Sequence, residues 1–508
     1  MTRYFRYGSC AALICSLSAP AAYADLTAQD VWQEWNSYLT STGYDVTADT
    51  ETSGDTLTLS NLKLMIPVPE DDTVVTLGIP SMALVENDDG TVNAVFPASL
   101  PISVEVQGSD TEELDAVVTM THSNGKMLIS GDPSQYTYVH SSDTLDFELT
   151  SLSIEDEPDA SDAIKAKFSV KGSNGESTIA LADMRSFTQD YKADSLSYDL
   201  TFSDPDSTDA GSFKGELSGL SMNGSGEMPI EFDNSDMAAM LAAGFEMKGN
   251  MSYSAGNSDL QGSGDGQEFS ATTSSQGGSV AVQMDSTNIG YDLKGQNTTV
   301  AVTASELPFP VSIEAAQAAL SFLLPVAKTD DPQDFSFAMN LQDFKMSDML
   351  WNLFDPQGTL PRDPATVSID TTGKATLAFD MLDPEAAMQM ETQGTPPGEL
   401  NEIDINNLLV SMVGAKLEGQ GSFTFDNSDL ESFGGAPRPQ GEMDLSLTGA
   451  NGLLDKLIEM GFVSSQDAMG ARMMMGMLAV PGEGPDSLKS KIEINEQGQI
   501  LANGQRLK

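Results

Sequence analysis

The amino-acid sequence predicts a mainly β (α+β) protein, in which antiparallel meander sheets are flanked by short amphipathic helices. Many segments alternate apolar and polar residues with period two, as in 56–59 and 102–106. Turn-forming pairs punctuate these segments: Asp89-Gly90, Asn124-Gly125 and Asn174-Gly175. The alternating positions are rich in Ser and Thr, which is typical of a sheet with one solvated face. The strands are therefore expected to pair as consecutive hairpins.

Helices are predicted where apolar residues recur every three to four positions. Thr27 and Asp30 form a capping-box-like start, and Gly43 offers a stop, so the first helix is expected between them. Its apolar face would dock against a sheet. The same argument predicts further helices at 235–245, 312–328, 347–355, 453–461 and 464–480.

Residues 1–24 have the pattern of an export signal. Arg3 and Arg6 precede a short apolar stretch, and Ala22-Tyr23-Ala24 supplies the small residues of a cleavage site. Cleavage after Ala24 would remove both cysteines of the chain, Cys10 and Cys15. The expected product is a cysteine-free periplasmic protein, which excludes disulfides and thiolate chemistry.

The chain is expected to have two halves after this signal. A boundary is predicted at Pro308-Phe309-Pro310, because two prolines there interrupt the strand pattern. Residues 25–307 would form an N-terminal helix with an antiparallel β half. Residues 308–508 would form a second β half with helices and a C-terminal hairpin.

The composition is strongly acidic. Asp and Glu number 76 and Lys and Arg number 24, which gives a formal net charge of −52 at pH 7. Such a field repels nucleic acid and anionic lipid surfaces, so neither is expected as a partner. Two interpretations of the acidity stay open, a saline habitat or a cationic partner. No apolar run after residue 24 approaches the ~20 residues of a membrane-spanning helix.

No enzymatic motif is present. The sequence lacks the G-x-S-x-G, H-E-x-x-H, P-loop and G-x-G-x-x-G patterns, and it has two histidines, His122 and His140. No enzyme activity, cofactor or metal site is expected. The hydrolase alternative requires one of these histidines to lie within hydrogen-bond reach of a serine and a carboxylate.

Methionine is abundant, with 27 residues. Met469, Met473 and Met477 recur at i, i+4 and i+8 on one predicted helix. One interpretation is a helix packed on a sheet with methionine as gap-filler; the other is an adaptable apolar surface for a lipid or a partner. A second apolar cluster, Leu350, Trp351 and Phe354, lies on the helix predicted at 347–355.

Three stretches carry a resemblance to a known family: residues 349–364, 449–457 and 498–504. They resemble a family of exported proteins of Gram-negative, alphaproteobacterial origin that has no assigned function. That family is distantly similar to the AsmA-like periplasmic proteins. The resemblance implies long antiparallel sheets curved into an open groove with short helices at its ends.

Two functions are expected from these observations. The first is a non-enzymatic periplasmic envelope protein that binds a lipid or another hydrophobic ligand in a β-groove. Its contact candidates are Leu350, Trp351, Phe354, Met469, Met473 and Met477. The second is a structural or adaptor module that binds another envelope protein through an acidic face or a sheet edge. A continuous apolar groove would favour the first.

Overall fold

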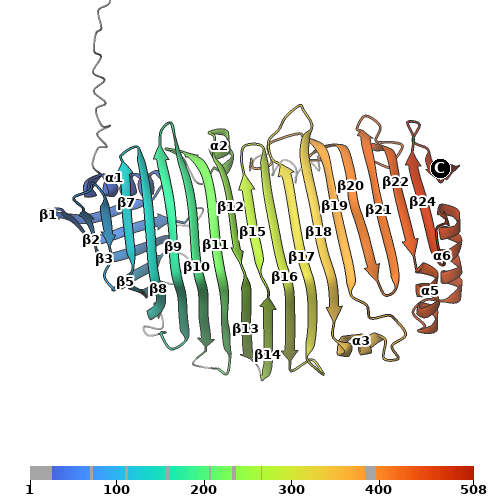
Figure 1. Ribbon diagram of the computed structural model, residues 1–508, viewed down its shortest axis with the longest axis horizontal. Coiled ribbons are helices and arrows are strands. Elements are labelled where there is room, and N and C mark those ends of the chain that lie inside the picture. Colours follow the sequence, from blue (N-terminus) through green and yellow to red (C-terminus); the bar gives the residue numbers. More distant parts are fainter. Residues whose placement is uncertain are drawn as a thin grey trace, which may run out of the picture.

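One large curved antiparallel sheet forms the body of the protein. The computed structural model describes residues 26–507, except 69–72, 109–112, 155–159, 205–206, 232–235, 265 and 384–395. The expected signal, residues 1–24, therefore lies outside the described residues. Within them, 26 strands join in one sheet, and their order follows the chain from one end of the molecule to the other (Figure 1). The predicted mainly antiparallel β fold is confirmed.

The first part of the sheet begins at an edge strand and widens into long strands. β3 pairs with both β4 and β5, and β8 pairs with both β6 and β7, so short strands lie end to end beside long ones. The strands here are β1 (Asp45–Ser53), β2 (Thr56–Pro67), β3 (Val74–Glu86), β4 (Val92–Val95), β5 (Ser99–Gln107), β6 (Leu114–Ser123), β7 (Lys126–Asp132), β8 (Gln135–Ile154), β9 (Ile164–Leu181), β10 (Met184–Ser203) and β11 (Ala210–Pro229).

The second part continues the meander to the C-terminal end. β12 and β13 both pair with β11, and β14 and β15 both pair with β16, before single long strands resume. The strands are β12 (Glu246–Tyr253), β13 (Ala255–Gly264), β14 (Gln267–Ser275), β15 (Gly278–Met284), β16 (Asn288–Ala304), β17 (Val311–Pro325), β18 (Gln333–Met346), β19 (Ala365–Leu377), β20 (Gly398–Met412), β21 (Ala415–Asp426), β22 (Arg438–Thr448), β23 (Val480–Pro481), β24 (Ser487–Ile494), β25 (Ile500–Ala502) and β26 (Gln505–Arg506).

Short helices lie around the sheet: α1 (Ala28–Ser41), α2 (Met237–Ala242), α3 (Asp348–Phe354), α5 (Ala450–Glu459) and α6 (Ser465–Leu478). The capping box predicted for α1 is present, because the Thr27 hydroxyl accepts from the Asp30 N–H and the Asp30 carboxylate accepts from the Thr27 N–H. Gly43 follows this helix at φ 82°, the left-handed conformation expected of its stop. α1 lies at the N-terminal end of the sheet, and α5 and α6 lie at the other end (Figure 1).

The main hydrophobic core lies at the N-terminal end. There α1 packs on β2, β3, β4 and β7, and the buried residues are Leu26, Ala28, Val31, Leu57, Leu59, Met82, Leu84, Val92, Ala94, Ile129 and Tyr136. Two smaller clusters lie around Leu152 and around Met240. Over much of the described sheet beyond these clusters, the apolar side chains are half-buried or exposed.

A line of irregular residues crosses the sheet at the middle of its strands. Each has a left-handed φ between 44° and 60°: Asn61, Asn124, Gly172, Gly219, Asn297 and Asp343. In the register, Gly172 and Gly219 both face Asp194 of β10, and Asn297 and Asp343 both face Ala316 of β17. The pairing register is the same on both sides of these positions, so neighbouring strands turn together there. We call this line the crease.

The crease also shifts the phase of the side-chain alternation. In β16 the apolar residues are Tyr291 and Leu293 before Asn297, and Val300 and Val302 after it. These two sets differ by an odd number of positions, which would place them on opposite faces of a regular strand. The left-handed residue at the crease, Asn297, reverses the alternation and returns them to one face. The same phase shift occurs at Gly172 in β9, at Gly219 in β11 and at Asp343 in β18.

Three local predictions were wrong. The helix expected at 312–328 is the strand β17, which pairs with β16 on one side and β18 on the other. Its alanines favour a helix, but burial between two strands overrides this weak preference. Asn174-Gly175 is not a turn, because it lies within β9. Asn124-Gly125 joins β6 and β7, which both pair with β8 and not with each other.

The expected boundary near residue 308 falls in the connection between β16 and β17. These strands pair from Asn288 opposite Pro325 to Val302 opposite Val311, so the sheet runs through this point without interruption. The division into two halves stays a prediction about sequence organisation.

Candidate functional site

The most extensive surface feature is an apolar row that runs across the sheet. Residues directly opposite one another in paired strands share a face. Following the register from β10 to β22 gives the row Tyr191, Met222, Met251, Val280, Leu293, Leu320, Met339, Ile369, Leu408, Gly419 and Leu445. At ~4.8 Å per strand spacing, these eleven strands span roughly 50 Å. We call this set the central apolar row.

A parallel row lies two residues further along each strand. It contains Gly224, Gly249, Val282, Tyr291, Phe322, Phe337, Thr371, Ile405, Gly421, Met443 and Ile492. Along both rows no position is charged. Together with the apolar residues beyond the crease, these rows form one surface, which we call the apolar face.

Much of the apolar face is open. Ten of its large side chains are 39–49% exposed: Phe168, Phe202, Phe213, Met222, Met251, Leu260, Phe269, Leu293, Leu324 and Phe337. Single exposed apolar side chains are ordinary on protein surfaces, but a contiguous patch of this size marks an interaction site. Because the glycines of the rows have no side chain, the surface is lower at these positions than at the larger side chains beside them.

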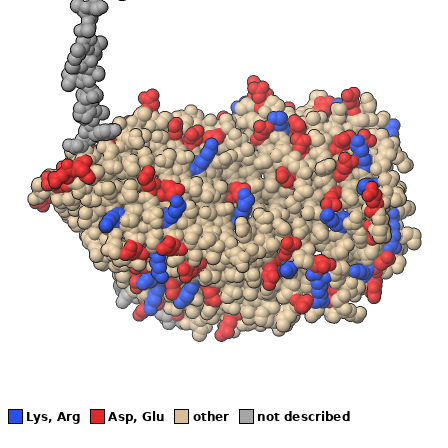
Figure 2. All heavy atoms as spheres, in the orientation of Figure 1, with Lys and Arg blue, Asp and Glu red and all other residues tan. Residues whose placement is uncertain are grey.

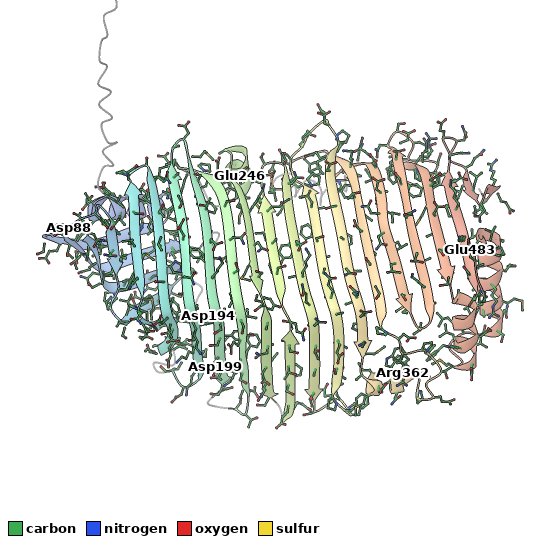
Figure 3. The ribbon with its side chains drawn as sticks, viewed as in Figure 1. Asp88, Asp194, Asp199, Glu246, Arg362 and Glu483 are labelled. Atoms are coloured by element: carbon green, nitrogen blue, oxygen red, sulfur yellow. The ribbon has the colours of Figure 1, made fainter. Side chains whose placement is uncertain are left out.

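The opposite face of the sheet is charged and solvated. Lysines on neighbouring positions pair with carboxylates there, as in Lys214–Asp199 at 3.1 Å, Lys294–Asp292 at 3.0 Å and Lys374–Asp334 at 2.7 Å. Figure 2 shows acidic and basic side chains spread across the view of the molecule. Asp194, at the crease, and Asp199 follow one another along β10 in Figure 3.

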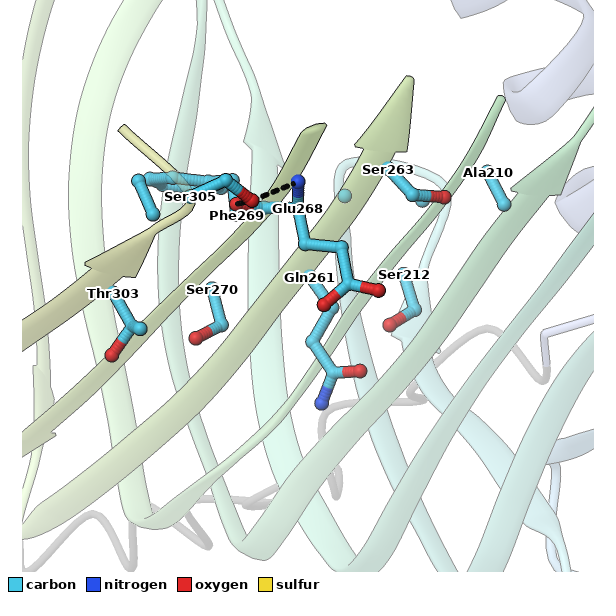
Figure 4. Close-up of a pocket in the computed structure, with 12 residues that line it drawn as sticks. Ala210, Ser212, Gln261, Ser263, Glu268, Phe269, Ser270, Thr303 and Ser305 are labelled. Atoms are coloured by element: carbon cyan, nitrogen blue, oxygen red, sulfur yellow. Dashed lines mark hydrogen bonds between the residues drawn. The ribbon is translucent and has the colours of Figure 1, made fainter. Parts of the chain in front are cut away.

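A polar hollow of about 620 Å³ lies near the ends of β11, β13, β14 and β16 (Figure 4). Its side chains are mostly hydroxyls and an amide, including Ser212, Gln261, Ser270 and Thr303. The Glu268 N–H donates to the Ser305 hydroxyl at 2.8 Å. These groups alternate with the apolar residues of the same strands, so the hollow belongs to the charged face.

Helices close the apolar face at its N-terminal end and at one rim. At the N-terminal end Arg185 of β10, which follows the alternation of this face, forms a buried ion pair with Glu34 of α1. Nearby, the Trp35 indole N–H donates to the Tyr138 hydroxyl at 3.2 Å. α2 packs through Met240 and Leu241 on methionines of β11, β12 and β15.

A cavity of about 560 Å³ opens on the apolar side of the crease, next to α1. It is lined from both sides of the bend, by Met127 and His140 on one side and by Met120 and Leu145 on the other, with Phe96 between them. This volume is within the range of small-molecule sites. We call it the crease cavity.

Both histidines of the chain line the crease cavity, which sequence reasoning did not anticipate. The His140 ring packs against Tyr191 with centroids 4.9 Å apart, and burial lowers the pKa of its imidazole below the ordinary value. His122 Nε2 lies 3.3 Å from the Phe96 carbonyl oxygen, and its Nδ1 is buried without a partner. The two histidines lie on different strands, β6 and β8, so no signal in the sequence showed that they line the same cavity.

The serines near the histidines do not complete a catalytic arrangement in the described residues. Ser142 and Ser173, which also line the crease cavity, hydrogen-bond to each other at 2.9 Å. Across the described residues, neither imidazole is hydrogen-bonded to a serine hydroxyl or to a carboxylate. The cavity lining contains no Asp or Glu.

The predicted candidates on α3 belong to a small folded loop. Trp351 is buried, Leu350 is half-buried and Phe354 is exposed; the two aromatic rings lie 5.2 Å apart. The buried Asp355 carboxylate accepts from the Thr359 and Leu360 N–H groups at 2.8 and 2.9 Å. Burial raises the pKa of this carboxyl, but these hydrogen bonds outweigh it and leave the pKa below its ordinary value.

The predicted candidates on α6 are exposed. Met469, Met473 and Met477 are 70%, 66% and 57% exposed, so this methionine face is not packed on the sheet. α6 is instead held by Arg472, which donates to Asp455 of α5 at 2.6 Å, and by Ser490, which donates to the Leu478 carbonyl. α3 and α6 lie at different places around the sheet (Figure 1), so the two sets do not form one cluster.

The chain belongs to a bacterial protein family. The family described as uncharacterized protein conserved in bacteria (DUF2125) matches residues 235–503, more than half of the chain. The match runs from the start of α2 to β25 and includes most of the central apolar row, but it excludes the crease cavity. No curated protein and no solved structure matches the chain.

Two features are absent from the described residues. None of their helices is long and apolar enough to cross a membrane. In the same residues, no group of three or more His, Cys, Asp or Glu is arranged to hold a metal ion.

Proposed function

We propose that the protein is a non-catalytic, exported envelope protein of the periplasm, distantly similar to AsmA-like proteins, that holds the acyl chains of a lipid on its apolar face. The observation that carries this proposal is the central apolar row. It crosses eleven strands without a charged side chain, and three of its residues, Met222, Met251 and Leu293, are 40–43% exposed.

The chemistry of the apolar face favours hydrocarbon as its occupant. Its strands are paired on both sides, so their backbone groups are already hydrogen-bonded and offer nothing to a peptide strand. Methionine and phenylalanine beside glycine form an adaptable surface for flexible chains. The row, at roughly 50 Å, exceeds the ~15 Å that acyl chains of one bilayer leaflet span, so more than one chain has room.

The edges of the sheet make the adaptor alternative less suitable. β1 is an exposed edge strand that carries Asp45, Asp49 and Glu51, and like charges on an edge discourage pairing with another strand. At the other edge β26 has two residues. The lysines of the charged face are largely engaged with neighbouring carboxylates.

Native mass spectrometry tests the proposal on protein purified from periplasm without detergent, followed by lipid extraction. We expect a stoichiometric lipid mass on a chain that begins at Asp25. A bare protein mass would contradict acyl-chain binding, and a chain that retains residues 1–24 would contradict export with cleavage.

A variant pair sharpens this test. Leu293→Asn with Phe337→Asn places two amides on open positions of the apolar face, so we expect most of the co-purified lipid to be lost. Lys294→Gln, on the charged face of the same strand, is the matched control and should retain it. Equal lipid content in both proteins would show that the lipid binds elsewhere.

A further inference from the structure

The crease cavity is continuous with the central apolar row. His140 lies opposite Met127 on one side and Gly175 on the other, and Gly175 lies opposite Tyr191, the first residue of the row. Since Gly175 has no side chain, the His140 and Tyr191 rings meet across it. A ligand that fills the cavity therefore has a direct path to Met222 and the row beyond.

The crease cavity differs from the row in its hydrogen-bonding groups. Two imidazoles and Lys126 line it, while the row itself has no titratable group besides the Tyr191 phenol. Burial lowers the pKa of the His140 imidazole below its ordinary value. The ring is therefore mainly neutral near pH 7 and has one N–H donor. Within the described residues this ring has no hydrogen-bond partner.

His122 adds a second polar group in the same place. Nε2 donates to the Phe96 carbonyl oxygen, and Nδ1 is the other nitrogen of the ring. This Nδ1 is buried without a partner, held close to Gly125, where an added Cβ would lie 2.4 Å from it. Buried polar atoms without partners are uncommon and concentrate at functional sites.

We propose that the crease cavity binds the carboxylate head of an acyl-chain ligand, with the His140 imidazole N–H as donor and with the chain lying along the central apolar row. This deepens the proposed function and rests on it. An oxygen anion accepts a hydrogen bond from an imidazole, whereas a quaternary ammonium head does not. The chain is acidic overall, but no Asp or Glu lines this cavity, so a carboxylate meets no like charge there.

Two amphiphiles with the same chain test the proposal on the whole protein by calorimetric titration: dodecanoate and dodecyltrimethylammonium. His140→Phe keeps the ring shape and removes both nitrogens, and Lys192→Gln, on the charged face of β10, is the control. Losing one hydrogen bond to a charged group should weaken dodecanoate about tenfold in His140→Phe. Binding of dodecyltrimethylammonium should stay the same, and Lys192→Gln should bind both as the wild type does.

The imidazole NMR signals of wild-type protein give an independent readout, since there are two histidines to assign. Dodecanoate should move the His140 signals and raise the pKa of this imidazole. If dodecanoate binds while these signals stay still, or if His140→Phe binds it as tightly as the wild type, the head lies elsewhere and only the acyl-chain function stands. If neither amphiphile binds wild-type protein, the proposed function itself fails. Should His140→Phe not fold, the wild-type NMR titration decides.

Discussion

Glu34 of α1 and Arg185 of β10 form a buried ion pair that joins two residues 151 positions apart. Their side chains are 6% and 7% exposed, and the Arg185 guanidinium also lies over the Tyr38 ring at 4.5 Å. This pair fixes the helix over the N-terminal end of the apolar face. It places these two buried charges under a helix, away from the open part of the face.

Removing one partner of this pair should be costly, because the other charge would remain buried. We expect Glu34→Gln to lower the free energy of unfolding by about 3–5 kcal/mol. Urea denaturation measures this change. The double variant Glu34→Leu with Arg185→Met removes both charges and should recover most of the loss; a double variant as unstable as the single one would contradict this account.

The crease glycines are predicted to be intolerant of side chains. Gly172 has φ 60°, and an added Cβ would lie 2.2 Å from Asp194 Oδ2. Gly172→Ala should destabilise the protein by about 1–2 kcal/mol through backbone strain, with a further loss as Asp194 moves. Gly266→Ala is the control, since its φ is 76° but nothing lies within 4 Å. Thermal unfolding should show a larger decrease in melting temperature for Gly172→Ala than for Gly266→Ala. Equal decreases would mean that Asp194 can move away from the added Cβ without a cost in stability.

Stability should fall at alkaline pH because of two tyrosines beneath α1. Burial, with the charge of Glu34, raises the pKa of Tyr136 to about 12, and burial likewise raises that of Tyr138 to about 12. The unfolded chain loses these protons near the ordinary pKa of 10. The folded state thus retains protons that the unfolded state has lost between about pH 10 and 12, and the free energy of unfolding decreases there. Denaturation across this range should show a shallower decrease in Tyr138→Phe than in the wild type.

The methionine face of α6 should oxidise before the methionines of the core. Met469 is 70% exposed and Met473 is 66% exposed, whereas Met82 is 4% exposed. Mild peroxide treatment followed by peptide mass mapping should find sulfoxide first in the α6 peptide. Bound lipid that covered α6 would slow this reaction, so lipid-free and lipid-bound samples give different rates only if α6 contacts the lipid.

The sequence predicted the fold class because its signals are local. Thr27, Asp30 and Gly43 define the first helix within a few residues, and the alternation of individual strands needs no distant partner. Residues 312–328 were mispredicted because alanine favours a helix locally, while the two strands that bury β17 are separated from it by turns. Asn174-Gly175 has the composition of a turn but lies in β9, which continues on both sides of the crease.

The apolar face and the crease cavity depend on register, which the sequence does not display. In β9, β10, β11, β16, β17 and β18 the phase of the alternation changes at the crease, so the apolar positions of each of these strands look like two short strands with opposite faces. Only the pairing shows that Leu293 and Val300 lie on one face. His122 and His140 line the same cavity because β6 and β7 both pair with β8, a connection that no motif encodes.

The meander order has a consequence for the size of the molecule. From β17 to β21 each strand pairs only with its neighbours in sequence, so this part of the sheet behaves as a one-dimensional stack of hairpins. Insertion or deletion of one hairpin in this region would change the length of the row by about 10 Å while every other strand keeps its partners. Family members with more or fewer of these hairpins would therefore have a longer or shorter apolar row, built from the same repeating unit.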